Sequence, residues 1–179
     1  MLDASKEMTM AKKQVVYAFI DSQNLNMGIR SLGWKLDYRK FRQYLNNKYQ
    51  VQRAYIFIGY VAGNEFMYAK LQQAGFILVF KPTMELPDGS IKGNVDAELV
   101  LHAMLFLPEY DKAIIVSGDG DFHCLVEHLV SINKLLRLMV PNKKFSGFLR
   151  KFNKYITRVD LLKKSLALKK TEISGRSKP

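Results

Sequence analysis

Apolar residues along this chain fall into short runs that alternate with segments of helical periodicity. Runs rich in β-branched and aromatic residues cover 15–20, 51–58, 76–80, 113–116 and 135–140. Between them the pattern predicts helices that begin at Ser22 and Asp37, and others over 65–73, 94–107 and 121–133. Strands that alternate with helices are typical of a parallel sheet with crossover connections. We therefore predict an α/β fold built on a mostly parallel sheet.

The remaining segments carry weaker signals. Residues 81–93 contain two prolines and an Asp-Gly pair, which indicates a loop. Residues 145–152 have helical spacing, 155–159 form a short extended piece, and a basic helix begins at Asp160. We expect one domain over residues 14–168, with flexible segments at 1–13 and 169–179.

Four aspartates stand where an apolar run ends or a helix begins. Asp21 closes the first run, Asp119 and Asp121 follow the run at 113–116, and Asp96 opens a long apolar helix. The carboxyl ends of parallel strands meet at the crevice where such sheets bind ligands. Several carboxylates cannot share a crevice in ionised form unless a cation neutralises them. The pattern favours a metal site.

The same residues also have purely structural interpretations. Asp21 and Asp121 could each cap the helix that follows. Gly118 and Gly120 could be turn residues, or they could let a metal or substrate approach the backbone. Capping does not require Asp119 as well, so the set as a whole favours the metal site.

The charge of the chain points to a polyanionic partner. The net charge is +12, and the stretch from Asn142 to the end holds 12 basic and 2 acidic residues. A solvated basic tail is the alternative. Aromatic residues at helical spacing are interleaved with these cations, so we expect most of the aromatics in the core and the cations on the outer face, bound to phosphates. The cations proposed for nucleic acid are Lys143, Lys144, Arg150, Lys151 and Lys154, with Lys92 beside the acidic residues to grip the scissile phosphate.

Other features concern the cellular location. The single cysteine excludes an internal disulfide framework and fits a reducing compartment. The sequence has no apolar stretch long enough for a transmembrane helix and no signal peptide pattern. We expect a cytoplasmic protein with no membrane partner.

Three motifs resemble those of a known family, and they occur in the same order. They are Asp21 with Asn24 three residues later, the segment Lys92-Gly93-Asn94-Val95-Asp96, and the segment Ser117-Gly118-Asp119-Gly120-Asp121-Phe122. Over about residues 15–160 the chain resembles the NYN domain, a branch of the PIN-like ribonuclease superfamily, and most closely its LabA-like members. The resemblance implies a Rossmann-like sheet of five to six strands with helices on both faces.

The resemblance also implies an activity and roles for residues. It implies a metal-dependent ribonuclease that uses Mg²⁺ or Mn²⁺ to hydrolyse RNA, with departure of the 3′-hydroxyl and a 5′-phosphate product. Asp21 and Asp119 would be the principal metal ligands, and Asp96 and Asp121 would complete the site. Asn24 would orient a ligand or a phosphate, and Ser117 would hydrogen-bond a carboxylate or a metal-bound water.

One departure from the family pattern leaves alternatives open. LabA-like members often have a second aspartate six residues after Asp96, and here that position is His102. Glu98 could compensate, or Glu98 and His102 could pair with each other along the helix. A catalytically weakened RNA-binding adaptor is therefore the main alternative. A small-molecule phosphohydrolase is a weaker alternative, because the first strand is not followed by an Asp-x-Asp pair: Asp21 is followed by Ser22 and Gln23. A homodimer would extend a binding groove, although no residue demonstrates it.

Overall fold

The computed structural model describes residues 13–81, 84–85, 91–92 and 95–169. The expected flexible segments at 1–13 and 169–179 lie outside this description, apart from one residue of each. Within the described ranges, no helix combines the length and the apolar character that are needed to cross a membrane.

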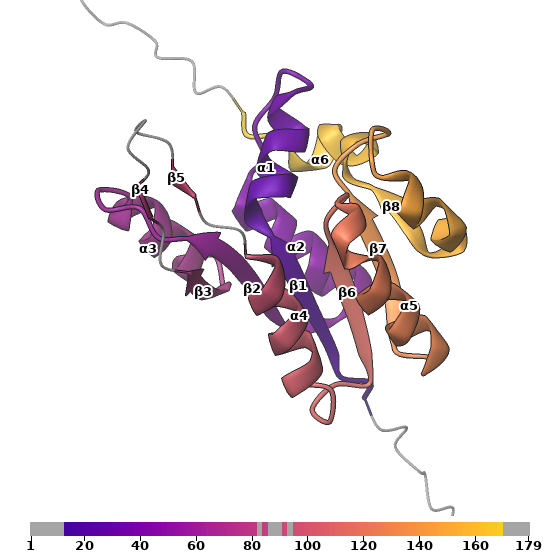
Figure 1. Cartoon of the computed structure of the whole chain (residues 1–179). Coiled ribbons are helices and arrows are strands. Elements are labelled where there is room, and N and C mark those ends of the chain that lie inside the picture. The colour runs from indigo at the N-terminus through magenta and orange to yellow at the C-terminus, as the bar shows by residue number, and fades with distance from the viewer. Residues whose placement is uncertain (1–12, 82–83, 86–90, 93–94, 170–179) are drawn as a thin grey trace, which may run out of the picture.

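Six parallel strands form the central sheet, in the order β3-β2-β1-β6-β7-β8 (Figure 1). The strands are β1 (Val16–Asp21), β2 (Val51–Gly59), β3 (Ile77–Lys81), β6 (Lys112–Val116), β7 (Leu135–Val140) and β8 (Ile156–Arg158). The central strands β1 and β6 are buried along almost their whole length, which explains why they read as continuous apolar runs. The predicted α/β fold with a mostly parallel sheet is confirmed.

Helices cover both faces of this sheet (Figure 1). One face packs against α1 (Ser22–Arg30), α2 (Tyr38–Tyr49), α3 (Glu65–Gln73), the 3₁₀ helix η3 (Val159–Leu162) and α6 (Lys163–Leu166). The other face packs against α4 (Asp96–Leu105), η1 (Gly120–Phe122), α5 (His123–Ser131) and η2 (Gly147–Tyr155). Each face has its own apolar core.

The chain adds strands to one side of β1 first and to its other side afterwards. The chain moves from β1 to β2 and β3 on one side, and then returns to β6 and β7 on the other. The order reverses between β1 and β6, and open α/β sheets bind ligands at such a reversal. This point is the top of the sheet in Figure 1.

Two local features differ from the sequence prediction. The expected loop at 81–93 contains the short antiparallel pair β4 (Met84–Glu85) and β5 (Ile91–Lys92). The helix expected over 121–133 begins instead as the 3₁₀ turn η1 and continues as α5. Both depend on local backbone hydrogen bonds, to which apolar periodicity is insensitive.

Candidate metal centre

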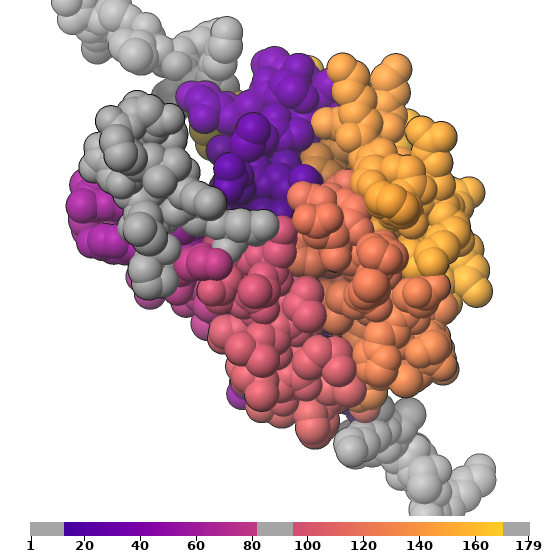
Figure 2. Space-filling view, viewed as in Figure 1, coloured from indigo at the N-terminus to yellow at the C-terminus, as the bar shows by residue number. Residues whose placement is uncertain are grey.

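Three carboxylates converge where the strand order reverses. Oxygens of Asp96, Asp119 and Asp121 all lie within 4.8 Å of one another. Asp96 is the first residue of α4, Asp119 follows β6, and Asp121 lies in η1. Figure 2 shows the indigo β1–α1 region, α4 in pink and the orange η1–α5 region meeting near the middle of this face. Ligands on opposite sides of Mg²⁺ are about 4.2 Å apart, so the three carboxylates fit the shell of one hard cation with little movement.

Asp21 lies behind this trio and is only 4% exposed. Its Oδ1 accepts a hydrogen bond from the Asn24 backbone N at 3.0 Å, and its Oδ2 accepts one from Ser117 Oγ at 3.1 Å. Burial raises the pKa of Asp21, and the nearby carboxylates of Asp96 and Asp119 raise it further, against the lowering effect of the two hydrogen bonds. The resemblance suggests Asp21 and Asp119 as principal ligands, whereas the geometry groups Asp119 with Asp96 and Asp121.

Ser117 and Asn24 hold the loop that carries Asp119. Ser117 Oγ is fully buried, and it accepts a hydrogen bond from the Asp119 backbone N at 3.1 Å while it donates to Asp21. Asn24 Oδ1 accepts a hydrogen bond from the Gly118 backbone N at 2.8 Å. The side-chain oxygen of Asn24, expected to orient a ligand or phosphate, is therefore occupied by the protein backbone. Both residues position the acidic groups.

Helix capping does not use every carboxylate oxygen of this site. Asp21 caps α1, as the structural interpretation proposed. The cap of η1 is Asp119 rather than Asp121, because Asp119 Oδ1 accepts a hydrogen bond from the Asp121 backbone N at 3.1 Å. Within the described residues, the second oxygen of Asp119 makes no hydrogen bond, so capping leaves it available to a cation.

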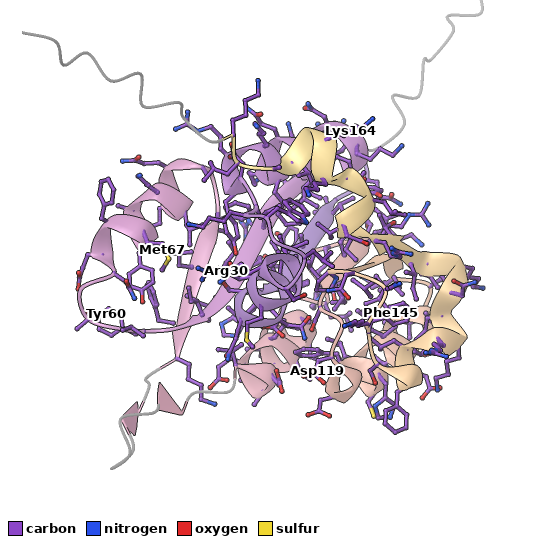
Figure 3. All side chains as sticks on the ribbon, turned by 90° about the horizontal axis from the view of Figure 1, so that it is seen from above. Arg30, Tyr60, Met67, Asp119, Phe145 and Lys164 are labelled. Atoms are coloured by element: carbon purple, nitrogen blue, oxygen red, sulfur yellow. The ribbon has the colours of Figure 1, made fainter. Side chains whose placement is uncertain are left out.

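The two glycines of this loop make room for protein. A Cβ at Gly120 would lie 2.3 Å from Ser146 Oγ, and a Cβ at Gly118 would lie 3.2 Å from Phe145 Cβ. Ser146 N also donates a hydrogen bond to Gly118 O at 2.9 Å. In Figure 3 the labelled side chains of Asp119 and Phe145 lie near one another. The close approach of Pro141 and of the 145–148 segment therefore favours glycine at both positions.

His102 and Glu98 are outside the trio. The His102 ring packs edge-on against Phe57 at 5.4 Å and Phe106 at 5.7 Å. Its Nδ1 lies 2.8 Å from the backbone carbonyl oxygen of Glu98, so these two residues do not pair through their side chains. The Glu98 carboxylate lies 3.3 Å from Lys81 Nζ. His102 is therefore held by aromatic packing, at the position where the resemblance led us to expect a second aspartate.

The sequence profile of the NYN domain matches residues 15–162. The chain belongs to the NYN domain family. NYN domains are part of the PIN-like nuclease superfamily. The acidic trio and Asp21 therefore lie in a nuclease-type fold, and the match spans the whole sheet.

This NYN domain is similar to two further proteins. The low amplitude and bright protein LabA of Synechococcus elongatus is 29% identical over 122 residues, which are 62% of this chain and 65% of LabA. The crystal structure of a protein of unknown function from Vibrio parahaemolyticus is 27% identical and superposes with a TM-score of 0.74 over 90% of this chain and all of that one. The second similarity extends the agreement from sequence to the arrangement of the elements.

Apart from Lys92, the cations predicted to bind nucleic acid lie in η2 and in the loop before it, and this loop packs against the loop that carries Asp119. We refer to them as the basic flank. Lys143, Lys144 and Arg150 are exposed. Lys151 pairs with Glu127, and Lys154 Nζ lies 4.9 Å from the centre of the Tyr155 ring. The side chain of Lys92 lies outside the described part of the molecule.

Phe148 is the exception among the aromatic residues of this segment. Most aromatics of this segment were expected in the core, as Phe152 is, but Phe148 is 69% exposed. The segment η2 consists of 3₁₀ turns with a kink at Phe152. Leu149 and Phe152 are buried, and Phe148 points outward. Its ring stacks on His123, with centroids 5.5 Å apart and an interplanar angle of 29°.

Proposed function

We propose that this protein is a metal-dependent ribonuclease that hydrolyses the phosphodiester bonds of RNA. The observation that carries the proposal is the trio Asp96, Asp119 and Asp121, with oxygens within 4.8 Å, in a NYN domain. A group of carboxylates this close gains stability from a divalent cation, since otherwise each opposes the ionisation of the others. Oxygen-only donors favour Mg²⁺ or Mn²⁺.

The residues of the site divide into two roles. Asp96, Asp119 and Asp121 would hold the cation, which when bound supplies an activated water and polarises the phosphodiester. Asp21 adds negative charge from behind, and its hydrogen bond with Ser117 fixes the loop. Hydrolysis would add water across the P–O3′ bond, with the oxygen of water on the 5′-phosphate and a proton on the departing 3′-hydroxyl.

The basic flank supports a polynucleotide substrate. Exposed Lys143, Lys144 and Arg150 can neutralise successive phosphates without reading sequence. Next to Asp121, the exposed Phe148 ring on His123 offers a flat surface on which a base can stack. Such a surface favours single-stranded RNA, in which the bases are unpaired.

The experiment is an RNA cleavage assay of the full-length protein with Mn²⁺, with Mg²⁺ and with EDTA, resolved on a denaturing gel. Cleavage with a divalent cation and none with EDTA is the expected result. His102 favours a second candidate function, an RNA-binding adaptor without catalysis, since the resemblance to LabA-like proteins predicts an aspartate at its position. Salt-sensitive RNA binding without cleavage under either metal would favour an RNA-binding adaptor over the ribonuclease.

A further inference from the structure

A cavity of about 790 Å³ lies beside the acidic site, between α1, α3, the start of α2 and the end of β2. Two of its lining residues are chain neighbours of the acids: Ser22 follows Asp21, and Val95 precedes Asp96. The cavity and the acidic site therefore share a wall. Its volume is in the range of about 300–1,000 Å³ that is typical of sites for small organic ligands.

The walls of the cavity are largely aromatic and aliphatic. Tyr38, Phe57 and Tyr68 all contribute to the lining. Tyr68 is held in place, because its hydroxyl accepts a hydrogen bond from the Val61 backbone N at 2.8 Å and lies 3.3 Å from Gly59 O. Rigid apolar walls suit a flat ring, and they do not suit a bare phosphate or a hydrated ion.

Amide side chains also line this cavity. Four amide side chains line it, and none of them makes a hydrogen bond within the described part of the chain: Gln23, Asn26, Asn64 and Gln73. Asn64 occupies the N-cap position of α3, yet its side chain makes no capping bond. Amides offer both donors and acceptors, as the edges of nucleobases do.

The charges in the lining favour a ligand that carries phosphate. Arg39 and Lys70 line the cavity, and Arg39 makes no ion pair within the described residues. The acidic lining residue Asp37 is already engaged, since it caps α2 and pairs with Lys40. A base in the cavity could thus have its own phosphate near a cation.

We propose that this cavity holds one unpaired nucleobase, with its ribose, of an RNA strand whose neighbouring phosphate lies at the acidic site. The inference rests on the proposed function and adds a point of base recognition to it. A base within a duplex could not enter, because its edge is paired and its faces are stacked. In Figure 3, Met67 lies on the α3 side of the molecule, away from the flank that carries Phe145. The cavity is therefore separate from the stacking surface at Phe148.

The test uses the full-length protein with Asp119→Asn, so that RNA is bound and not cut. Binding of a labelled single-stranded RNA is compared with a series in which each base in turn is replaced by an abasic unit. At the position whose base enters the cavity, removal of the base should weaken binding at least about five-fold, the lower end of what loss of a stacked base costs.

Filling the cavity should abolish the effect of removing that base on RNA binding. Met67 lines the cavity and is 41% exposed, so Met67→Trp can place an indole ring in the cavity without displacing the core. The matched control is Phe66→Trp, at the next residue of α3, which is 74% exposed and does not line the cavity. Asn64→Ala, which removes an exposed amide, provides a second variant, and circular dichroism checks the fold of all three.

The outcomes separate the two proposals. Loss of the single-position effect in Met67→Trp, with the effect retained in Phe66→Trp, is the expected result. RNA binding with no position sensitive to base removal, or an effect unchanged in both Met67→Trp and Asn64→Ala, would overturn the cavity assignment and leave the ribonuclease proposal intact. Absence of RNA binding by the wild-type protein would overturn both.

Discussion

Ser117 connects two of the acidic residues through a single hydroxyl group. It donates to Asp21 Oδ2 and accepts from the Asp119 backbone N, and it is fully buried. Groups that orient metal ligands are typically as important for affinity as some of the ligands themselves. The hydroxyl of Ser117 therefore belongs to the metal site, although it is not expected to touch the ion.

We predict that Ser117→Ala lowers the affinity for Mn²⁺ by about 10- to 100-fold, the usual cost of losing such a positioning group. Isothermal titration calorimetry of the purified protein measures this. Ser131→Ala is the control, because Ser131 also donates a hydrogen bond, to His128 O, but lies at the end of α5. Equal Mn²⁺ affinity in Ser117→Ala and the wild type would show that the hydroxyl does not organise the site.

The raised pKa of Asp21 predicts how the free energy of unfolding changes with pH. Its pKa is raised from 3.8, chiefly by burial, so in a window above 3.8 the folded protein holds a proton that the unfolded chain has lost. Without a cation, the contribution of Asp21 to the free energy of unfolding therefore falls as pH rises through that window. A bound cation favours the ionised form and reverses the trend.

We predict that the increase in Tm caused by Mn²⁺, relative to EDTA, grows as pH rises from about 4.5 to 7.5. In Asp21→Asn, which cannot ionise, the part of this growth that is due to Asp21 should be absent. Thermal unfolding followed by circular dichroism at several pH values provides the measurement. An Mn²⁺-induced shift of equal size at every pH in the wild type would contradict the prediction.

Among the secondary-structure elements, η2 is one whose helix type could not be predicted from apolar periodicity. Strands β1, β2, β6 and β7 were predicted to within about one residue at each end, because burial in the sheet makes most of their positions apolar. The 3₁₀ geometry of η2 could not be read from the same pattern, since three- and four-residue spacings both occur there. Phe148 is exposed in that geometry.

We predict that Phe148→Ala weakens binding of single-stranded RNA by about 1–3 kcal/mol, or about 5- to 150-fold, if a base stacks on this ring. Leu161→Ala is the control, because Leu161 is similarly exposed, at 72%, but lies on η3, at the other face of the sheet. Fluorescence anisotropy with a labelled RNA in EDTA measures the binding without cleavage. The stacking role is lost if both substitutions weaken binding equally.

For the molecule as a whole, charge is distributed so that an acidic site faces a basic flank. The sequence predicted the convergence of acids at one edge of the sheet, because strand ends in a parallel sheet share an edge. It could not predict that Asp21 would stand behind the other three, since relative depth depends on how α1, α4 and η1 pack. Nor could it reveal the cavity between α1 and α3, which exists only in the folded chain.

We predict a steep salt dependence of RNA binding, to which the basic flank contributes. Replacing Lys143, Lys144 and Arg150 together with glutamine should reduce the slope of log K against log salt by about 2, at about 0.7 per phosphate contact with a single strand. Anisotropy titrations over a range of KCl concentrations test this. An unchanged slope would place the RNA on another surface.

The most direct measurement is metal-dependent RNA cleavage by Asp119→Asn beside Glu109→Gln. Both replace a carboxylate with its amide, but Glu109 precedes β6 at the opposite edge of the sheet, where it bonds Tyr17 and Arg53. The amide oxygen of Asn at 119 can still accept from the Asp121 backbone, so the loop should persist. We predict that Asp119→Asn binds RNA but cleaves it at least about 100-fold more slowly, while Glu109→Gln cleaves at the wild-type rate. Undiminished Mn²⁺-dependent cleavage by Asp119→Asn would contradict the assignment of this acidic site as the catalytic centre.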